Sequence, residues 1–354
     1  MKILLISIDL VLGTRILVNV LKDKGIKSHI LQIAGIKYSD LFSKKQLKDI
    51  YGFSKKYDAV GLAFNSFYPI LAAQLGRYLK SKGVKWIIAG GPHATAMPEE
   101  TMGYSDISII YEAELTLPKV LKSLSSDNSS SFQEINGIAF KDKNGKIVKT
   151  GCPRIETNLD NIPFQSFSSK DITYYNFRSG KFDKPTVNNL FPHGGRNYFI
   201  LTSRGCPFKC TYCCNNLFAK LSADFNKIRK RSVRNIISEM KLAKKSGFKG
   251  FYIVDDNFLA FTLEELKEFA KLYSGEINLP FGISGLNPNN MRVKDSDKKI
   301  GLLLSCGLSD IRIGVQSGSN KTLKMFQRRY AAEELPNLLS AFENRKTIWK
   351  APND

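Results

Sequence analysis

The first 125 residues alternate between short apolar runs and stretches in which apolar residues recur every three or four positions. Short runs are typical of buried strands, and the longer period is typical of amphipathic helices. The pattern predicts strands at 2–8, 28–33, 59–64, 86–89 and 107–110, with helices near 14–24, 43–55, 69–82 and 114–124. Strands that alternate with helices predict a doubly wound, flavodoxin-like parallel sheet with both faces covered, an α/β fold.

Residues 126–196 interrupt this alternation. A polar stretch begins at Ser126, and Asn144-Gly145 separates two short β-prone runs, which predicts a hairpin. Residues 151–196 are rich in Pro, Ser and aromatic residues, and we expect them to form a linker with little helix.

From residue 197 the alternation resumes. The pattern predicts strands at 198–202, 250–254, 281–284 and 310–315, with helices around 232–246, 262–273, 295–306 and 320–326. Four strand-helix units predict a partial (β/α) barrel. A chain of 354 residues exceeds what one small core needs. We therefore expect two domains, 1–125 and 197–354, joined by the hairpin and linker at 126–196.

The formal net charge of +21 comes from Lys and Arg residues dispersed along the chain, with one longer basic block at 227–231. A dispersed excess favours a solvated surface over a nucleic-acid site, and an anionic substrate or membrane surface is the alternative. No apolar run reaches the roughly 20 residues of a membrane span. Asp9 interrupts the apolar start, which argues against a signal peptide. We expect a cytoplasmic protein without a transmembrane segment.

Three cysteines follow the predicted strand 198–202 within one loop: Cys206, Cys210 and Cys213. Three thiolates can hold a soft metal centre and leave one position open, whereas a closed zinc site or an ordinary cubane cluster takes four protein ligands. A zinc site with Cys214 as the fourth ligand is the alternative. Structural disulfides would leave an odd thiol in this loop. We interpret Cys152, Cys214 and Cys306 as ordinary thiols.

The spacing Cys-x3-Cys-x2-Cys, with Tyr212 before the last cysteine, resembles the signature of radical S-adenosylmethionine (SAM) enzymes. The resemblance implies that the three cysteines bind a 4Fe-4S cluster whose fourth iron is chelated by SAM. An electron from the cluster would then cleave SAM to a 5'-deoxyadenosyl radical.

Two further stretches, 255–258 and 314–319, resemble motifs of the same family. Together with the predicted third strand, they suggest SAM-binding residues: Asp255, Asp256, Ser284, Arg292 and Gln316. Gln316 stands where the family more often has Glu, but an amide can still donate and accept hydrogen bonds. In the alternative interpretation, Asp255 and Asp256 cap a helix and Gln316 is a surface residue.

Residues 89–100, with Asp106 and 112–114, resemble the cobalamin-binding domain fused to many radical SAM enzymes. The resemblance implies contacts with cobalamin from Gly90, Gly91, His93, Thr95 and Glu112. Two departures stand out: residues 111–114 read Tyr-Glu-Ala-Glu where the family usually has Gly-Glu-Gly-Glu, and residues 9–13 lack the Asp-x-His-x-x-Gly that supplies a cobalt ligand in other cobalamin proteins. A flavodoxin-like domain without a cofactor is the alternative.

Taken together, these resemblances imply a cobalamin-dependent radical SAM enzyme, a class that commonly methylates an unactivated carbon or phosphorus. They also imply a small-molecule or lipid substrate and an electron donor of the flavodoxin or ferredoxin type. One alternative is a methylthiotransferase acting on RNA or protein, although the first 151 residues lack the cysteines of its usual amino-terminal domain. Another is a catalytically degenerate cobalamin or cluster binder. Family barrels have six strand-helix units, so four units lead us to expect a short or truncated carboxyl-terminal end.

Overall fold

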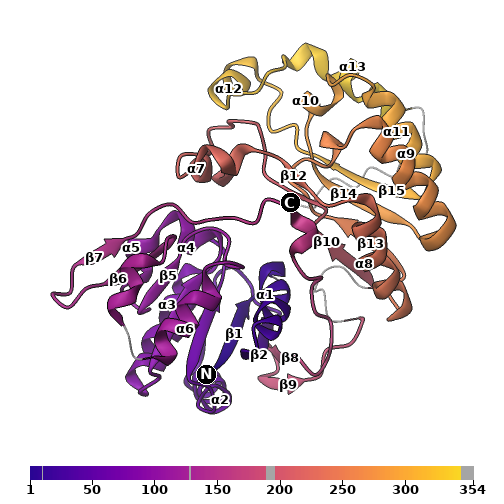
Figure 1. The fold of residues 1–354 in the computed structure, drawn as a ribbon. Helices are drawn as coiled ribbons and strands as arrows, with labels where there is room; N and C mark the ends of the chain where they lie inside the picture. The colour runs from indigo at the N-terminus through magenta and orange to yellow at the C-terminus, as the bar shows by residue number, and fades with distance from the viewer. Residues whose placement is uncertain (10, 127–128, 189–195, 344–354) are drawn as a thin grey trace. The chain divides into compact units, whose positions relative to one another are not determined.

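The computed structural model describes residues 1–9, 11–126, 129–188 and 196–343 (Figure 1). The chain divides into two compact units, which are described separately. The first comprises Met1–Thr157 and Asn161–Pro192, and the second comprises Asn158–Asp160 and His193–Asp354.

The first unit is built on a nine-stranded sheet (Figure 1). Its strands are β1 (Lys2–Ile8), β2 (Lys27–Ala34), β3 (Ala59–Ala63), β4 (Trp86–Gly90), β5 (Ile107–Ile109), β6 (Ile138–Lys141), β7 (Ile147–Lys149), β8 (Ile172–Asn176) and β9 (Lys181–Asp183). Its helices are α1 (Leu12–Asp23), α2 (Lys44–Ser54), α3 (Pro69–Ser81), α4 (Pro92–Ala96), α5 (Pro98–Thr101) and α6 (Leu117–Ser125).

The central strands follow the order β2-β1-β3-β4-β5 and are all parallel. This is the flavodoxin-like order, in which the chain reverses its winding direction between β1 and β3. The predicted doubly wound sheet is confirmed. Residues 3–6 of β1 are at most 4% exposed, as expected for a central strand that is covered on both faces.

Residues 126–196 extend this sheet at both edges. The predicted hairpin is confirmed: β6 pairs antiparallel with β5 and with β7, and Gly145 in the turn has a positive φ of 76°. Within the segment that we expected to be a linker, β8 pairs parallel with β2, and β9 pairs antiparallel with β8. The short helices α4 and α5 were also not predicted.

The second unit contains a four-stranded parallel sheet in the order β10-β13-β14-β15. Its strands, including a separate two-stranded pair, are β10 (Asn197–Ile200), β11 (Ser203–Arg204), β12 (Arg229–Lys230), β13 (Gly250–Ile253), β14 (Phe281–Leu286) and β15 (Leu308–Ile313). Its helices are α7 (Cys214–Ala219), α8 (Val233–Lys245), α9 (Leu263–Leu272), α10 (Pro288–Met291), α11 (Ser296–Ser305), α12 (Asn320–Met325) and α13 (Leu335–Glu343).

Helices α8, α9 and α11 lie side by side along this sheet (Figure 1). Each strand is followed by a helix before the next parallel strand, so the predicted partial (β/α) barrel is confirmed. Among the described residues, β10 and β15 are the two outer strands.

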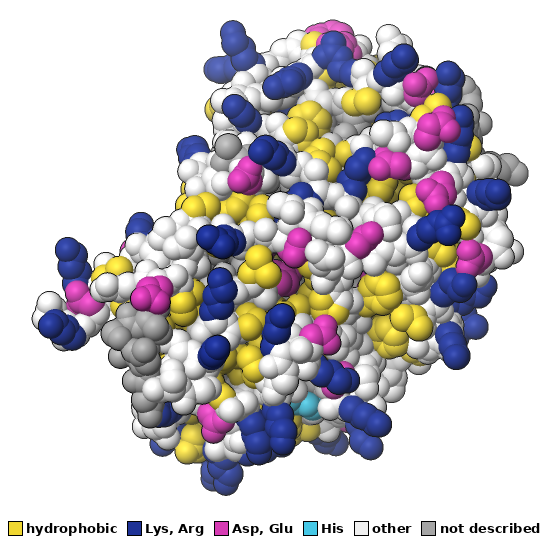
Figure 2. Space-filling model, viewed as in Figure 1, with side chains coloured by type: hydrophobic (Ala, Val, Ile, Leu, Met, Phe, Trp, Pro, Cys, Tyr) yellow, Lys and Arg dark blue, Asp and Glu magenta, His cyan; other side chains and the backbone are white. Residues whose placement is uncertain are grey.

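Basic side chains are dispersed over the face shown in Figure 2 rather than gathered into one patch. The basic block at 227–231 is partly internal, because Arg229 is buried and Arg231 forms an ion pair with the buried Glu239. Within the described part of the chain, no helix combines the length and the hydrophobicity that crossing a membrane requires.

Candidate functional site

The carboxyl ends of β10 and β13 are joined by the buried side chain of Asp255. Its carboxylate accepts hydrogen bonds from the backbone N–H of Thr202 at 2.6 Å, from the Thr202 hydroxyl, and from Ser203 Oγ at 2.7 Å. Burial raises the pKa of Asp255 to about 6, although these hydrogen bonds act in the opposite direction. Asp255 therefore holds the strand end from which the cysteine loop departs.

The cysteine loop lies between β11 and β12, which pair antiparallel and close its base. Gly205 opens the loop with a φ of +94°, and a Cβ atom there would lie 2.3 Å from the backbone oxygen of Lys227. Only glycine fits this close approach without a backbone shift. The base of the loop therefore requires both the strand pair and this glycine.

The three cysteines have different surroundings within this loop. Cys210 is buried, and its backbone oxygen accepts from the N–H of Cys213 at 3.1 Å. The pKa of Cys206 is raised to about 11, chiefly by burial and also by the negative charges of Asp256, Cys213 and Cys210, while a backbone hydrogen bond from Phe208 acts in the opposite direction. Asp256 itself is exposed. Cys206 therefore interacts electrostatically with the other two thiols and with Asp256.

Cys213 has a lowered pKa, in contrast to Cys206. A hydrogen bond from the Cys214 side chain lowers the pKa of Cys213 to about 6, and backbone N–H groups at the start of α7 contribute to this shift. Among the described residues, no three or more His, Cys, Asp or Glu side chains are arranged to hold a single metal ion.

The far side of the loop packs against the segment that follows α12. Thr211 Oγ1 donates to the backbone oxygen of Met325 at 3.0 Å, and the rings of Tyr212 and Phe326 meet edge to face at 4.8 Å. The Arg328 guanidinium donates to the Tyr212 hydroxyl. No sequence pattern predicts these contacts, which join residues more than 110 positions apart.

The other predicted SAM-binding residues are dispersed around the same end of the sheet. Ser284 on β14 donates to the backbone oxygen of Ile253 at 3.3 Å. Gln316 follows β15, is exposed, and has a φ of +73°. Arg292 donates to the backbone oxygen of Arg329 and forms a 3.1 Å ion pair with Glu334, so in this structure its charge is already engaged.

A buried group of asparagines at the carboxyl ends of β13 and β14 was not predicted. Asn290 Nδ2 donates to Asn257 Oδ1 at 2.6 Å, and Asn287 caps the first turn of α10. Asn289 is 7% exposed, and its buried Oδ1 has no hydrogen-bond partner among the residues that the structure describes. A buried acceptor without a partner is costly unless a ligand or water satisfies it. The signal in the sequence is the polar run Asn287-Pro288-Asn289-Asn290 shortly after the predicted strand at 281–284.

In the first unit, the predicted cobalamin residues lie where β4 ends. A Cβ atom on Gly90 would meet nothing within 4 Å, so open space adjoins this backbone. Gly91 differs: its φ is +99°, and a Cβ there would lie 2.5 Å from the backbone oxygen of Phe64. Gly91 therefore serves strand packing, whereas Gly90 leaves room for a ligand.

The side chains that follow Gly91 build the loop itself. His93 is 6% exposed; its Nδ1 lies 3.1 Å from Ser66 Oγ and its Nε2 lies 3.4 Å from Glu100. Thr95 Oγ1 donates to the backbone oxygen of Gly91 and accepts from the N–H of Tyr111 at 2.8 Å. Glu112 is half-buried. His93 and Thr95 thus shape the ends of β4 and β5.

Large apolar side chains are exposed at the same edge of the sheet. They belong to the loop after β2, the start of α3 with its preceding loop, and the turn before α5: Tyr38, Leu41, Phe67, Ile70 and Met97. Tyr38 and Phe67 meet at 6.2 Å between ring centroids. A cluster of exposed apolar side chains marks a surface suited to a large ligand or a partner.

Comparison with known proteins places this geometry in context. Residues 200–345 match the family described as the radical SAM superfamily. Cytidylyl-2-hydroxyethylphosphonate methyltransferase of Streptomyces wedmorensis is 24% identical over 66% of this chain and 45% of its own length. A probable threonylcarbamoyladenosine tRNA methylthiotransferase of Pyrococcus horikoshii is 26% identical over 54% of this chain and 44% of its own. The chain thus spans about half the length of these relatives.

Two solved structures share the fold across both units. OxsB, a cobalamin-dependent SAM radical enzyme solved with aqua-cobalamin and SAM, aligns with 96% of this chain and 47% of its own at a TM-score of 0.73 and 17% identity. TsrM from Kitasatospora setae, a radical SAM methyltransferase solved with tryptophan and a SAM analogue, aligns with 98% of this chain and 66% of its own at a TM-score of 0.74 and 15% identity.

Proposed function

We propose that this chain, whose residues 200–345 match the radical SAM superfamily, is a cobalamin-dependent radical SAM enzyme that methylates an unactivated carbon or phosphorus. The observation that carries the proposal is the position of Cys206, Cys210 and Cys213 in one loop at the carboxyl end of β10, where the chemistry of a (β/α) barrel is found. Its substrate would be a small molecule or a lipid.

The three cysteines would bind a 4Fe-4S cluster through their thiolates. When bound, the cluster and SAM supply a 5'-deoxyadenosyl radical, and cobalamin supplies a transferable methyl group. The thiols must ionise when they bind the cluster, and the lowered pKa of Cys213 favours this step at that residue. Asp255 acts as a positioning residue, because it ties Thr202 and Ser203 to the end of β13.

SAM would lie against the carboxyl ends of β13, β14 and β15. The unpartnered Asn289 Oδ1 supports a ligand there, because an amino group of SAM could donate to it. Asp256, Ser284 and Gln316 remain candidates for further contacts. Arg292 could contact the SAM carboxylate only after releasing Glu334.

Cobalamin would lie against the carboxyl ends of the parallel strands in the first sheet. The open space at Gly90 and the exposed apolar side chains of the neighbouring loops support this placement. His93 fits a role in shaping the loop better than a role as cobalt ligand, because protein groups lie beside both of its ring nitrogens. Glu112 would contribute from the loop after β5.

The second candidate function is methylthiolation of RNA or protein, which the tRNA methylthiotransferase relative favours. Two observations favour the first function instead. The first 151 residues contain no cysteine, and the basic block that could bind RNA has Arg229 and Arg231 turned into the protein. A degenerate binder that retains cobalamin without cleaving SAM is the third possibility.

Anaerobic reconstitution with iron, sulfide and hydroxocobalamin tests the assignment of cofactors. We expect about four iron and four sulfide per chain, together with one retained corinoid, and loss of the iron in Cys206→Ala. Zinc in place of iron, with no corinoid retained, would overturn the proposal. We also propose that the protein is cytoplasmic, because a reducing compartment suits free thiols and an oxygen-sensitive cluster. Its electron donor would be a protein of the flavodoxin or ferredoxin type.

A further inference from the structure

A groove of about 620 Å³ runs along α6 in the first unit and is separate from the sites described above. Its floor is apolar and includes Ile26, Pro118 and Leu121, while Leu115 lies beside it with 38% of its surface exposed. The volume falls within the range of small-molecule sites. Its lining includes Leu115, just before α6, and continues to Ser125 at the end of that helix, whose nine residues span about 13 Å.

Four cationic side chains surround this floor: Lys24, Lys119, Lys122 and Arg154. All four are exposed, and none has an ion-pair partner among the described residues. Glu114, which is buried, is the one carboxylate among the described lining residues. The groove therefore combines apolar surface with an excess of positive charge.

Favourable interactions with helix ends explain the positions of only two of these four cations. Lys24 caps the carboxyl end of α1 and Lys122 lies in the last turn of α6, where a cation stabilises the exposed carbonyl groups. Lys119 lies in the first turn of α6, where the helix dipole disfavours a cation. Arg154 lies on an irregular segment after β7. Stabilisation of a helix end therefore does not explain the positions of Lys119 and Arg154.

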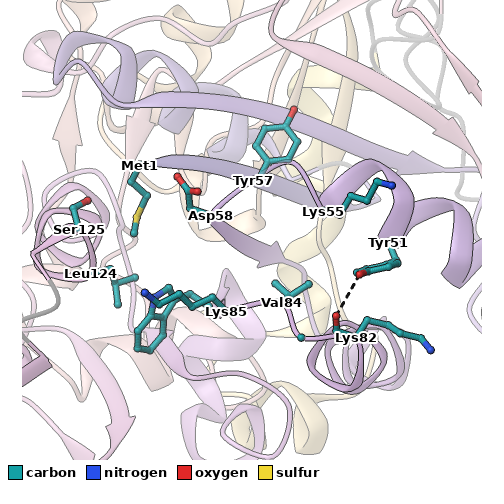
Figure 3. A pocket seen from close by; sticks show the side chains of 12 residues that line it. Met1, Tyr51, Lys55, Tyr57, Asp58, Lys82, Val84, Lys85, Leu124 and Ser125 are labelled. Carbon is teal, nitrogen blue, oxygen red and sulfur yellow. Dashed lines mark hydrogen bonds between the residues drawn. The ribbon is translucent and has the colours of Figure 1, made fainter.

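A neighbouring pocket of about 500 Å³ shares Met1 and Ser125 with the groove and serves as a comparison (Figure 3). Three lysines line it. Lys55 and Lys82 each cap the carboxyl end of a helix, α2 or α3, and Lys85 has an interaction partner within the protein. The Tyr51 hydroxyl donates to the backbone oxygen of Lys82 at 3.3 Å and so ties the ends of these helices together. These cations are explained without a ligand.

We infer that the groove along α6 binds a single-chain anionic amphiphile, with an alkyl or acyl chain on the apolar floor and a phosphate or carboxylate among Lys119, Lys122 and Arg154. The apolar chain of such a ligand matches the apolar side chains of the groove, and its anionic group matches the cations around them. Apolar contact and charge-assisted hydrogen bonds each contribute to affinity. The site would make the first unit responsive to a lipid-like anion, independently of cluster and cobalamin.

Calorimetric titration of the full chain with decyl phosphate below its micelle concentration tests this inference. We expect saturable binding of one molecule, at least about tenfold weaker binding of hexyl phosphate because four buried methylenes are lost, and no saturable binding of decanol or inorganic phosphate. Equal binding of decanol would reveal non-specific partition and overturn the inference. Binding to phosphatidylglycerol vesicles without binding of decyl phosphate would also overturn it, by pointing to a membrane surface.

Charge reversal at Lys119 locates the site. Lys119→Glu should weaken decyl phosphate binding by about tenfold or more, and it should leave the melting temperature unchanged or raised because an acid in the first turn suits the helix dipole. Lys44→Glu is the matched control, since Lys44 is an exposed first-turn lysine of α2 outside the groove; it should change affinity less than twofold. Equal affinity of Lys119→Glu and wild type would refute the placement.

Discussion

The Asp255 carboxylate accepts a hydrogen bond from the backbone N–H of Thr202 at 2.6 Å, and this contact joins the ends of two neighbouring strands below the cysteine loop. Asp255→Ala would leave this buried N–H without a partner and should lower the free energy of unfolding by about 2–4 kcal/mol. Asp255→Asn retains one acceptor oxygen and an amide that can donate to the two hydroxyl groups, so it should cost less than about 1.5 kcal/mol. Urea denaturation measures both, and equal losses would contradict this role.

The same carboxyl group predicts a pH dependence of stability. Its pKa is about 6 in the folded protein against an ordinary value of 3.8. Between these values the folded state keeps a proton that the unfolded chain releases, so the free energy of unfolding falls as the pH rises from about 4 to 6. The decrease from this group is roughly 3 kcal/mol. Asp255→Asn should lack this part of the slope in urea unfolding, and an unchanged slope would refute the assignment.

Gly205→Ala should disturb the base of the cysteine loop, because the added methyl group meets the Lys227 backbone oxygen at 2.3 Å and the φ of +94° is unfavourable for alanine. We expect a loss of about 2–3 kcal/mol in stability and less iron after reconstitution. Gly145→Ala is a control at a φ of +76° with nothing within 4 Å of the added atom. It should lose less stability and retain its iron. Normal iron content in Gly205→Ala would argue against this role of the loop base.

Gly90→Val separates ligand binding from folding at the carboxyl end of β4. The added side chain enters space that the protein leaves open, so the melting temperature should change by less than about 3 °C. Corinoid retention should fall at least about tenfold if cobalamin occupies that space. Gly91→Val is expected to destabilise the unit strongly, because it clashes with Phe64. Unchanged corinoid retention in a folded Gly90→Val protein would exclude the proposed cobalamin placement.

Much of the fold could be predicted because strand and helix periodicities dominate its sequence. The run Lys2–Ile8 is a strand with the predicted bounds, and Asn144-Gly145 correctly marked a hairpin. The position of β8 could not be predicted, because nothing within Ile172–Asn176 indicates that it pairs with β2. Pro92 and Pro98 each start a short helix, a signal that was available and overlooked.

Residues of the candidate site could be predicted only where they belong to a short sequence motif. The cysteine spacing identifies the loop, and the glycine pair after the predicted strand at 86–89 identifies Gly90, which adjoins open space. The role of Asp255 depends on donors more than 50 residues away, and the Tyr212–Phe326 contact depends on the return of the chain after β15. Such contacts are set by tertiary packing, which periodicity does not encode.

The proposed function requires that the three loop cysteines bind a cluster that cleaves SAM. The most direct measurement is 5'-deoxyadenosine formed by the anaerobically reconstituted chain with SAM and dithionite, compared among wild type, Cys206→Ala, Cys210→Ala, Cys213→Ala and the control Cys152→Ala. We predict that wild type and Cys152→Ala form 5'-deoxyadenosine and that the three loop variants do not. Absence of the product in a wild-type protein with a full cluster, or its undiminished formation by the loop variants, would contradict the account.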